Sequence, residues 1–222
     1  MQEPLSLDLL KKAANNYALS LTELEIPSLY GVTDGKAVGT FVEVGFNQFI
    51  AQNYVHQAGN AAKGIDFPEL NVDLKVTSIK QPQSSCPFRD ATQKIYGLGY
   101  HLLLIVYEKV DDPVAATARL NIQHVVFIEK QHTADFTTTR GLLRMIQDGS
   151  IVDDIDAYLQ DRNLPLDPES RRQLAERVLT EPPALGYITI SNALQWRLQY
   201  NHAIKASMLS DVLDVEALYA KQ

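Results

Sequence analysis

The chain has 222 residues, a formal net charge of −7 and one cysteine. The length suits one sizeable domain, and 45% hydrophobic with 21% charged residues is ordinary for a water-soluble globular protein. The lone Cys86 excludes an intramolecular disulfide and a multi-cysteine zinc site. No apolar run approaches the ~20 residues of a membrane span, and no signal peptide is recognisable, so we expect a cytoplasmic protein that does not enter a membrane.

The charge is distributed unevenly along the chain. Residues 75–105 carry four basic residues and one acid, a local +3, whereas residues 148–182 carry nine acids and four arginines, a local −5. A negative total counts mildly against nucleic-acid binding, but the distribution matters more than the total. The pattern is compatible with a basic DNA-binding cleft and an acidic back, and equally with a protein that binds no DNA.

Hydrophobic periodicity predicts two helices in the first quarter of the chain. The first runs from Ser6 to Tyr17 and is capped by Ser6 or Asp8. The second runs from Lys36 to Val55, and an Asp-Gly pair just before it supplies the start signal. A small, polar linker follows at 56–63.

The middle of the chain predicts a mixed sheet. A strand is expected at Asn71–Ile79, and a short helix at Asp90–Leu98. The apolar runs His101–Tyr107 and Ile122–Glu129 have the length and continuity of strands buried on both faces. These elements favour an α/β fold with a central mixed β-sheet flanked by helices.

The remainder is predicted to be mostly helical, with a short strand at Gly186–Ile190. We therefore expect a single domain over 1–222, with a catalytic core at about 34–130 and a helical C-terminal part at about 131–222. Helices are expected at 133–147, 151–160, 167–179, 193–208 and 212–222.

One group of charged residues has a chemical mechanism. Asp73 and Lys75 are two positions apart on the predicted strand Asn71–Ile79, so their side chains share one face. Asp66 lies seven positions before Asp73, with turn-forming residues between them that could fold it back. We expect Asp66 and Asp73 to hold Mg²⁺, which prefers oxygen ligands, and Lys75 to position water or stabilise charge on a phosphate.

Two further acids leave alternatives open. Glu43 lies beside the apolar stripe of the helix at Lys36–Val55, and is either a solvated helical residue or a third carboxylate of the site. Glu69 is the rival of Asp66 as the first metal ligand. We prefer Asp66, because Glu69 is only four positions before Asp73 and leaves less chain for folding back.

Polar residues elsewhere suit contacts with DNA. Gln can bond adenine bidentately, Ser can bond a base or a phosphate, and Arg and Asn suit base edges and phosphates. The alternatives are a plain surface loop at Gln81–Arg89 and a solvated helix face at 193–208. The candidate DNA-binding residues are Lys36, Lys80, Gln81, Gln83, Ser84, Ser85, Arg89, Arg197 and Asn201.

The pattern Asp66-x6-Asp73-x-Lys75 resembles the motif of the PD-(D/E)XK nuclease superfamily. Together with Lys36-x2-Gly-x3-Glu43, it looks like the MutH-like and HincII-like members, in which the helix glutamate is also an active-site carboxylate. The resemblance covers residues 36–80 and extends to about 130. Two departures are the missing Pro-Asp pair and an Asp as the second acid, where the nicking enzymes more often have Glu.

The resemblance implies a restriction-endonuclease-like fold and a type II restriction endonuclease. Such an enzyme would use Mg²⁺ to hydrolyse double-stranded DNA at a specific sequence, leave 5′-phosphates, and have a cognate DNA methyltransferase as its functional partner. A homodimer is expected, because cutting both strands of a palindrome calls for two sites related by a two-fold axis. The alternatives are a MutH-like nicking endonuclease of mismatch repair and a non-catalytic DNA-binding module.

Overall fold

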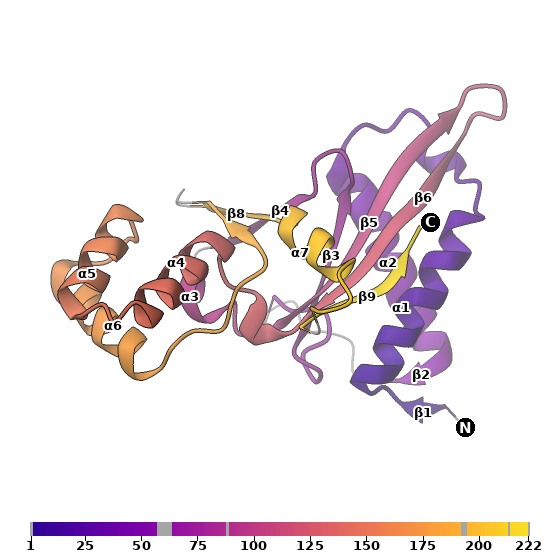
Figure 1. The fold of residues 1–222 in the computed structure, drawn as a ribbon. Coiled ribbons are helices and arrows are strands. Elements are labelled where there is room, and N and C mark those ends of the chain that lie inside the picture. The colour runs from indigo at the N-terminus through magenta and orange to yellow at the C-terminus, as the bar shows by residue number, and fades with distance from the viewer. Residues whose placement is uncertain (1, 57–63, 88, 192–194, 213, 222) are drawn as a thin grey trace.

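The computed structural model describes residues 2–56, 64–87, 89–191, 195–212 and 214–221, so most of the predicted linker at 56–63 lies outside it. The molecule is elongated, with a large sheet covered by two long helices at one end and a lobe of helices at the other (Figure 1). The helices are α1 (Leu7–Thr22), α2 (Gly35–Asn53), α3 (Gln93–Tyr96), α4 (Phe136–Gln147), α5 (Val152–Asp161), α6 (Pro168–Thr180) and α7 (Asn201–Ser207).

The main sheet has the strand order β3-β5-β6-β9. β3 and β5 are parallel, whereas β5 and β6, and β6 and β9, are antiparallel. This confirms the predicted mixed sheet flanked by helices. The four strands are β3 (Val72–Ser78), β5 (His101–Asp112), β6 (Thr117–Ile128) and β9 (Val215–Ala220).

Both faces of this sheet are buried, which explains the continuous apolar run in β5. Leu103 and Ile105 pack in the core under α1 and α2. Leu102, Leu104 and Val106 point to the opposite face, into a second core completed by residues from the C-terminal segment. Period-2 alternation between two apolar layers leaves no polar position in the middle of the strand.

The two N-terminal helices begin where their sequence signals predict. The Ser6 hydroxyl accepts a hydrogen bond from the backbone N–H of Leu9 and caps α1, which continues beyond the predicted end to Thr22. The Asp34 carboxylate accepts from the N–H of Lys36 and caps α2. Each cap satisfies a donor that the first helical turn leaves free.

A smaller antiparallel sheet, of order β4-β8-β7, lies between the main sheet and the helical lobe (Figure 1). Its strands are β4 (Gln83–Pro87), β8 (Gln195–Gln199) and β7 (Thr189–Ile190). The predicted loop at Gln81–Arg89 is therefore wrong over β4. The predicted helix at 193–208 is wrong over β8, and its first two residues lie outside the described chain.

The predicted terminal helix at 212–222 is also wrong, because β9 forms the outer strand of the main sheet. Its sequence, Val-Glu-Ala-Leu-Tyr-Ala, contains good helix formers, but pairing with β6 satisfies the backbone groups and buries Val215. Tertiary pairing therefore overrides local propensity. The remaining short elements are β1 (Glu3–Pro4), β2 (Tyr54–Val55) and the 3₁₀ turns η1 (Pro27–Leu29) and η2 (Lys130–His132).

The helical lobe has a core of its own. Residues of α4, α5 and α6, including Leu142, Ile155 and Leu174, pack together with Ile95 of α3. The three predicted helices are confirmed, and the Asp167 carboxylate caps α6 with Pro168 in its first turn. Within the described residues, no helix is long and apolar enough to cross a bilayer.

Asp135 joins the lobe to the smaller sheet. Its buried carboxylate accepts from the Thr138 N–H (2.8 Å) and hydroxyl (2.7 Å) at the start of α4, and from the Ile190 N–H (2.8 Å) of β7. Asp135→Ala leaves buried donors unpaired, so we expect a loss of roughly 2–4 kcal/mol in the free energy of unfolding. Chemical denaturation measures it. Asp167→Ala, at an exposed cap, is the control, and an equal loss in both variants would contradict the linking role of Asp135.

Candidate active site

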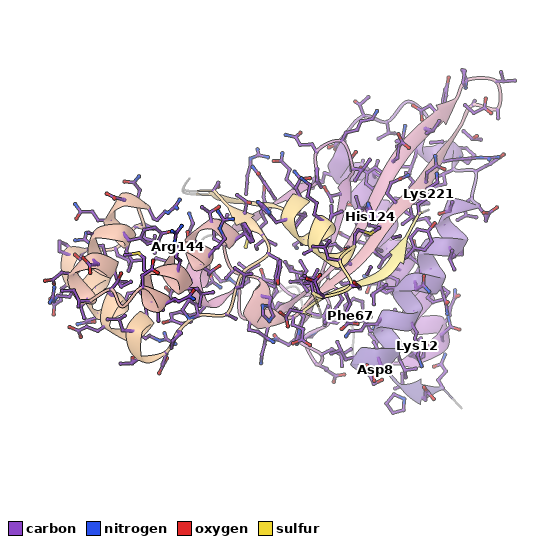
Figure 2. All side chains as sticks on the ribbon, in the orientation of Figure 1. Asp8, Lys12, Phe67, His124, Arg144 and Lys221 are labelled. Atoms are coloured by element: carbon purple, nitrogen blue, oxygen red, sulfur yellow. The ribbon has the colours of Figure 1, made fainter. Side chains whose placement is uncertain are left out.

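A tight turn brings Asp66 back to the edge of β3. Phe67 (labelled in Figure 2) and Val72 exchange two backbone hydrogen bonds of 3.0 and 3.1 Å. Asn71 adopts a φ of +55°, a left-handed conformation that Asn tolerates well. The Asp66 carboxylate oxygen Oδ2 then accepts from the backbone N–H of Leu74 at 2.8 Å. The reversal that the sequence suggested is therefore present.

Asp73 and Lys75 lie on the same face of β3. Their side chains form an ion pair, with 2.7 Å between Lys75 Nζ and Asp73 Oδ2. Val72 and Leu74 point the other way, into the core under α1 and α2. Asp73 is only 3% exposed, whereas Lys75 is partly accessible. Because side chains alternate between the two faces of β3, the buried residues Val72 and Leu74 fix the position of the Asp73–Lys75 pair on the opposite face.

Glu43 approaches the same group from α2, which packs against β3. It is half-buried, and its pKa is raised by burial and by the charge of Asp66, with Lys75 acting in the opposite direction. Glu69 is exposed within the turn. The structure therefore brings Glu43, Asp66, Asp73 and Lys75 together and leaves Glu69 on the surface.

The pKa values in this group reflect two acids, Asp66 and Asp73, that lie close together, with Asp73 buried. Burial raises the pKa of Asp73 to about 7; Lys75 opposes this rise, and a hydrogen bond that the protonated Asp73 carboxyl donates to Asp66 adds to it. Burial lowers the pKa of Lys75, but the negative groups of Asp73, Asp66 and Glu43 outweigh burial and raise it overall. Lys75 therefore remains a cation at neutral pH. The negative charge of the acids around it exceeds its single positive charge, so the site favours binding a further cation.

The donor set fits Mg²⁺. Among the described residues, no group of three or more His, Cys, Asp or Glu side chains is placed to hold a metal ion. Mg²⁺ does not need such a cage, since it binds through one or two carboxylates, keeps several waters and takes further oxygens from a phosphate. Asp66 and Asp73 supply that number of carboxylates.

Residues that the sequence analysis did not single out line the back of this group. Tyr200 is fully buried, and its hydroxyl lies 2.5 Å from that of Ser84. Burial raises the pKa of its phenol, and the charge of Asp73 adds to this rise. Burial likewise raises the pKa of the Tyr100 phenol, and the charge of Asp73 is a smaller cause in the same direction. Only the three-dimensional fold brings Tyr200 here, more than 100 positions away in sequence, so no local pattern could have shown it.

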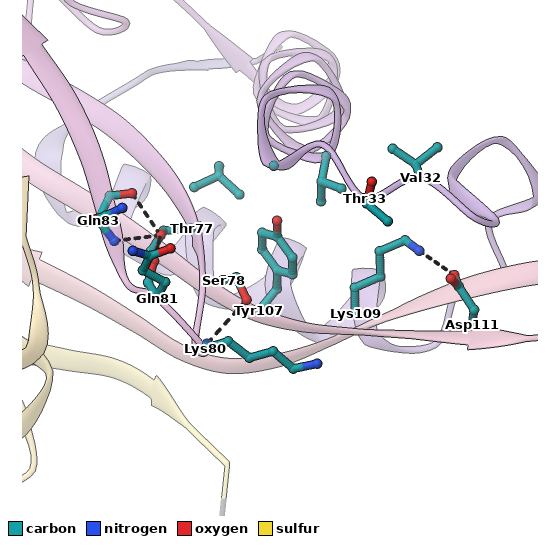
Figure 3. Close-up of a pocket in the computed structure, with 13 residues that line it drawn as sticks. Val32, Thr33, Thr77, Ser78, Lys80, Gln81, Gln83, Tyr107, Lys109 and Asp111 are labelled. Atoms are coloured by element: carbon teal, nitrogen blue, oxygen red, sulfur yellow. Dashed lines mark hydrogen bonds and ion pairs between the residues drawn. The ribbon is translucent and has the colours of Figure 1, made fainter.

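A cavity of about 540 Å³ opens beside the far end of β3 (Figure 3). Lys80, Gln81 and Gln83 line it together with Thr77, Ser78 and Lys109, which is ion-paired with Asp111. Gly35, the first residue of α2, lines the same cavity, and the exposed Lys36 follows it. Several predicted DNA-binding residues therefore converge at this end of the strand.

The other predicted DNA-binding residues divide into separate groups. Ser85 and Arg197 lie opposite each other on β4 and β8, and both are exposed. Ser84 points inward to Tyr200, which does not suit a DNA contact. Arg89 and Asn201 are exposed, but neither lines the cavity or belongs to β4 or β8. Arg197 is on a strand rather than on the predicted helix, and Asn201 begins α7.

Comparison with known proteins agrees with this picture. The family model "Type II restriction enzyme NspV" matches residues 4–214. The curated Type II restriction enzyme NspV of Nostoc sp. (strain ATCC 29411 / PCC 7524) is 51% identical over 185 residues, which cover 83% of this chain and 84% of the relative. No solved structure matched the chain.

Fold and family together define a type II restriction endonuclease, an enzyme that cuts DNA at a specific sequence. The chain belongs to the NspV family of type II restriction enzymes. This confirms the main functional prediction, ahead of the mismatch-repair nickase and the non-catalytic module.

The buried carboxyl of Asp73 should make the metal-free protein less stable as pH rises. Its pKa is higher in the folded chain than the ordinary 3.8, so the stability it contributes is present at low pH and is lost as pH rises toward about 7. In EDTA at pH 8, Asp73→Asn should raise Tm by ~3–6 °C, or about 1–2 kcal/mol after allowance for Lys75.

At pH 4 the difference in Tm between the two proteins should vanish, because wild-type Asp73 is then protonated. Thermal unfolding followed by circular dichroism at the two pH values measures this. A variant that is less stable than wild type at pH 8 would show that the ion pair with Lys75 outweighs burial.

Proposed function

We propose that this enzyme hydrolyses phosphodiester bonds with Mg²⁺ at a PD-(D/E)XK centre formed by Asp66, Asp73 and Lys75, assisted by Glu43. The supporting observation is the turn that places the Asp66 carboxylate on the N–H of Leu74, beside the Asp73–Lys75 ion pair. The carboxylate oxygens suit a divalent metal ion, which can polarise a phosphate and activate water, and Lys75 adds a cation beside them.

In this proposal Asp66 and Asp73 hold the ion. Bound Mg²⁺ would supply charge neutralisation at the scissile phosphate and lower the pKa of a bound water. Lys75 stays protonated, so it is a hydrogen-bond donor to the attacking water or to a phosphate oxygen rather than a general base. We assign to Glu43 the role of orienting the Lys75 ammonium; the support is that its charge is one of those that raise the pKa of Lys75.

The cavity at the end of β3 supports a DNA path along this strand. Lys80 is exposed there beside Gln81, and the N-terminus of α2 with Lys36 adjoins it. Ammonium groups and helix N-termini are common phosphate ligands, and such contacts set the register of a protein on the duplex. We assign Lys36, Lys80 and Gln81 to the phosphate backbone next to the scissile bond.

The proposal extends to the assembly and the cell. Two copies related by a two-fold axis would place one centre on each strand of a palindrome and leave 5′-phosphates on both ends. Such an enzyme would act on DNA in the cytoplasm, where a cognate methyltransferase protects the host's own sites. Gel filtration with and without a short duplex tests the homodimer.

Removal of the proposed catalytic groups should abolish cleavage but not DNA binding. Asp73→Ala and Lys75→Ala are expected to lower the rate of plasmid cleavage by at least ~10³-fold, because several kcal/mol of transition-state stabilisation are lost. Conversion of supercoiled plasmid to linear product, with nicked circles counted separately, gives the rate. Gel-shift binding in Ca²⁺ is the control for folding. Cleavage at the wild-type rate by pure Asp73→Ala protein would refute the proposed centre.

The identity of the first metal ligand can be tested by a matched pair of variants. Asp66→Asn should reduce cleavage about as strongly as a change at Asp73, because it removes one of two carboxylates from the ion. Glu69→Gln, an equivalent change at an exposed position of the same turn, should cut at nearly the wild-type rate. Titration with Mg²⁺ shows whether the loss is one of metal affinity. The opposite ranking would make Glu69 the ligand.

A further inference from the structure

β4 and β8 form a two-stranded antiparallel ribbon with one polar, outward face. Gln83 pairs directly with Gln199, and Ser85 with Arg197. Directly paired residues lie on the same face of a sheet, so these four side chains share one surface. Ser85, Arg197 and Gln199 are exposed and Gln83 is partly exposed. We call this surface the ribbon face.

The opposite side of the ribbon holds it to the protein. Cys86 and Leu198 are buried in the core beneath the smaller sheet. The Ser84 hydroxyl lies 2.5 Å from the hydroxyl of Tyr200, which is fully buried. The ribbon is therefore fixed from behind, and its face is free to meet a ligand without unfolding.

The chemistry of the ribbon face matches the base edges of the major groove. Arg pairs bidentately with O6 and N7 of guanine, Gln with N6 and N7 of adenine, and Ser with either base. The paired positions of this face carry one positive charge and no acid. The Arg197 side chain is exposed, so its donors are accessible to a ligand. A two-stranded ribbon also fits the width of that groove.

The ribbon is anchored to the catalytic strand. Buried Thr77, two positions beyond Lys75 on the same face of β3, accepts at Oγ1 from the N–H of Gln83 (3.0 Å) and donates to the Gln83 carbonyl (3.1 Å). This contact leaves little freedom between the ribbon face and the centre that would cut the DNA. A surface that reads bases must be held in this way if the cut is to fall at a fixed distance from them.

We propose that the ribbon face is the element that reads the recognition sequence, with Arg197, Gln199, Gln83 and Ser85 as specificity-determining residues in the major groove. The inference rests on the proposed function, since its ligand is the DNA cut at the Asp73 centre. Compared with the DNA-binding residues expected from the sequence, this assignment adds Gln199 and excludes Ser84. It also separates base reading on the ribbon from phosphate contacts at Lys36, Lys80 and Gln81.

The test compares binding and cleavage on duplexes with altered bases. The recognition sequence is first obtained by sequencing the ends of digested phage DNA. Wild type, Arg197→Ala and Gln199→Ala are then measured on the cognate duplex and on duplexes in which single guanines or adenines are replaced by their 7-deaza analogues, which lack N7. Binding is measured in Ca²⁺ and cleavage in Mg²⁺, so the two readouts are independent.

We expect wild type to lose about 10–100-fold in binding at one 7-deazaguanine position and at one 7-deazaadenine position. Arg197→Ala should bind the cognate duplex equally weakly and show no further loss at that guanine, while it keeps its sensitivity at the adenine. Gln199→Ala should show the converse. Arg119→Ala removes the same charge from an exposed position paired with Glu25, and should leave both sensitivities unchanged.

Two results would overturn the assignment. In the first, Arg197→Ala weakens binding to all duplexes equally and lowers the salt dependence by about one charge, which would mark a phosphate contact. In the second, both ribbon variants keep the wild-type response to every 7-deaza position. These results differ from those expected if the proposed catalytic centre is wrong. In that case Asp73→Ala would still cleave DNA, while the ribbon variants would show the expected pattern of binding.

Discussion

The hydrogen bond from the Leu74 N–H to the Asp66 carboxylate is the contact on which the site depends. β3 is an edge strand, so one side of its backbone has no neighbouring strand in the main sheet. A partly buried N–H on that side needs an acceptor. The turn at 67–72 brings Asp66 to supply it. The same bond that completes the edge of the sheet therefore fixes one acid beside another.

This arrangement is costly for the metal-free chain. Asp73 is buried next to Asp66, and Lys75 compensates only in part, so the carboxyl keeps its proton up to about pH 7. Packing of the surrounding apolar residues offsets this loss of stability, since Val72 and Leu74 are buried in the core under α1 and α2. If this group is the active site, as proposed, a rigid core that holds it in an unfavourable state also preorganises it to receive a cation.

Local signals made much of this architecture predictable. Caps and 3.6-residue periodicity marked α1, α2 and α4–α6, and apolar runs marked β5 and β6. The candidate site was also visible, because its strand residues and its turn lie within ten positions of one another, at Asp66, Asp73 and Lys75. Their roles remain predictions. These features depend on neighbours in sequence, so a single chain reveals them.

The ribbon could not be predicted, for a physical reason. Its strands are more than 100 positions apart, and one inward residue of β4 is Ser84, whose hydroxyl forms a hydrogen bond with that of the distant Tyr200. A polar inward position hides the alternation that identifies a strand. At the end of β8 the alternation of Arg197, Leu198 and Gln199 was present and continued to Tyr200, but it was short and led directly into α7.

The position of Thr77 connects the proposed base-reading ribbon to the proposed catalytic centre. Asp73, Lys75 and Thr77 occupy successive places on one face of β3, so one strand register sets both the chemical centre and the anchor of β4. A slip of one residue would turn all three side chains into the apolar layer. The pairing of β3 with β5 over seven residues opposes such a slip. Under the proposed functions of centre and ribbon, the distance between recognised base and broken bond is thus a property of the sheet rather than of a flexible loop.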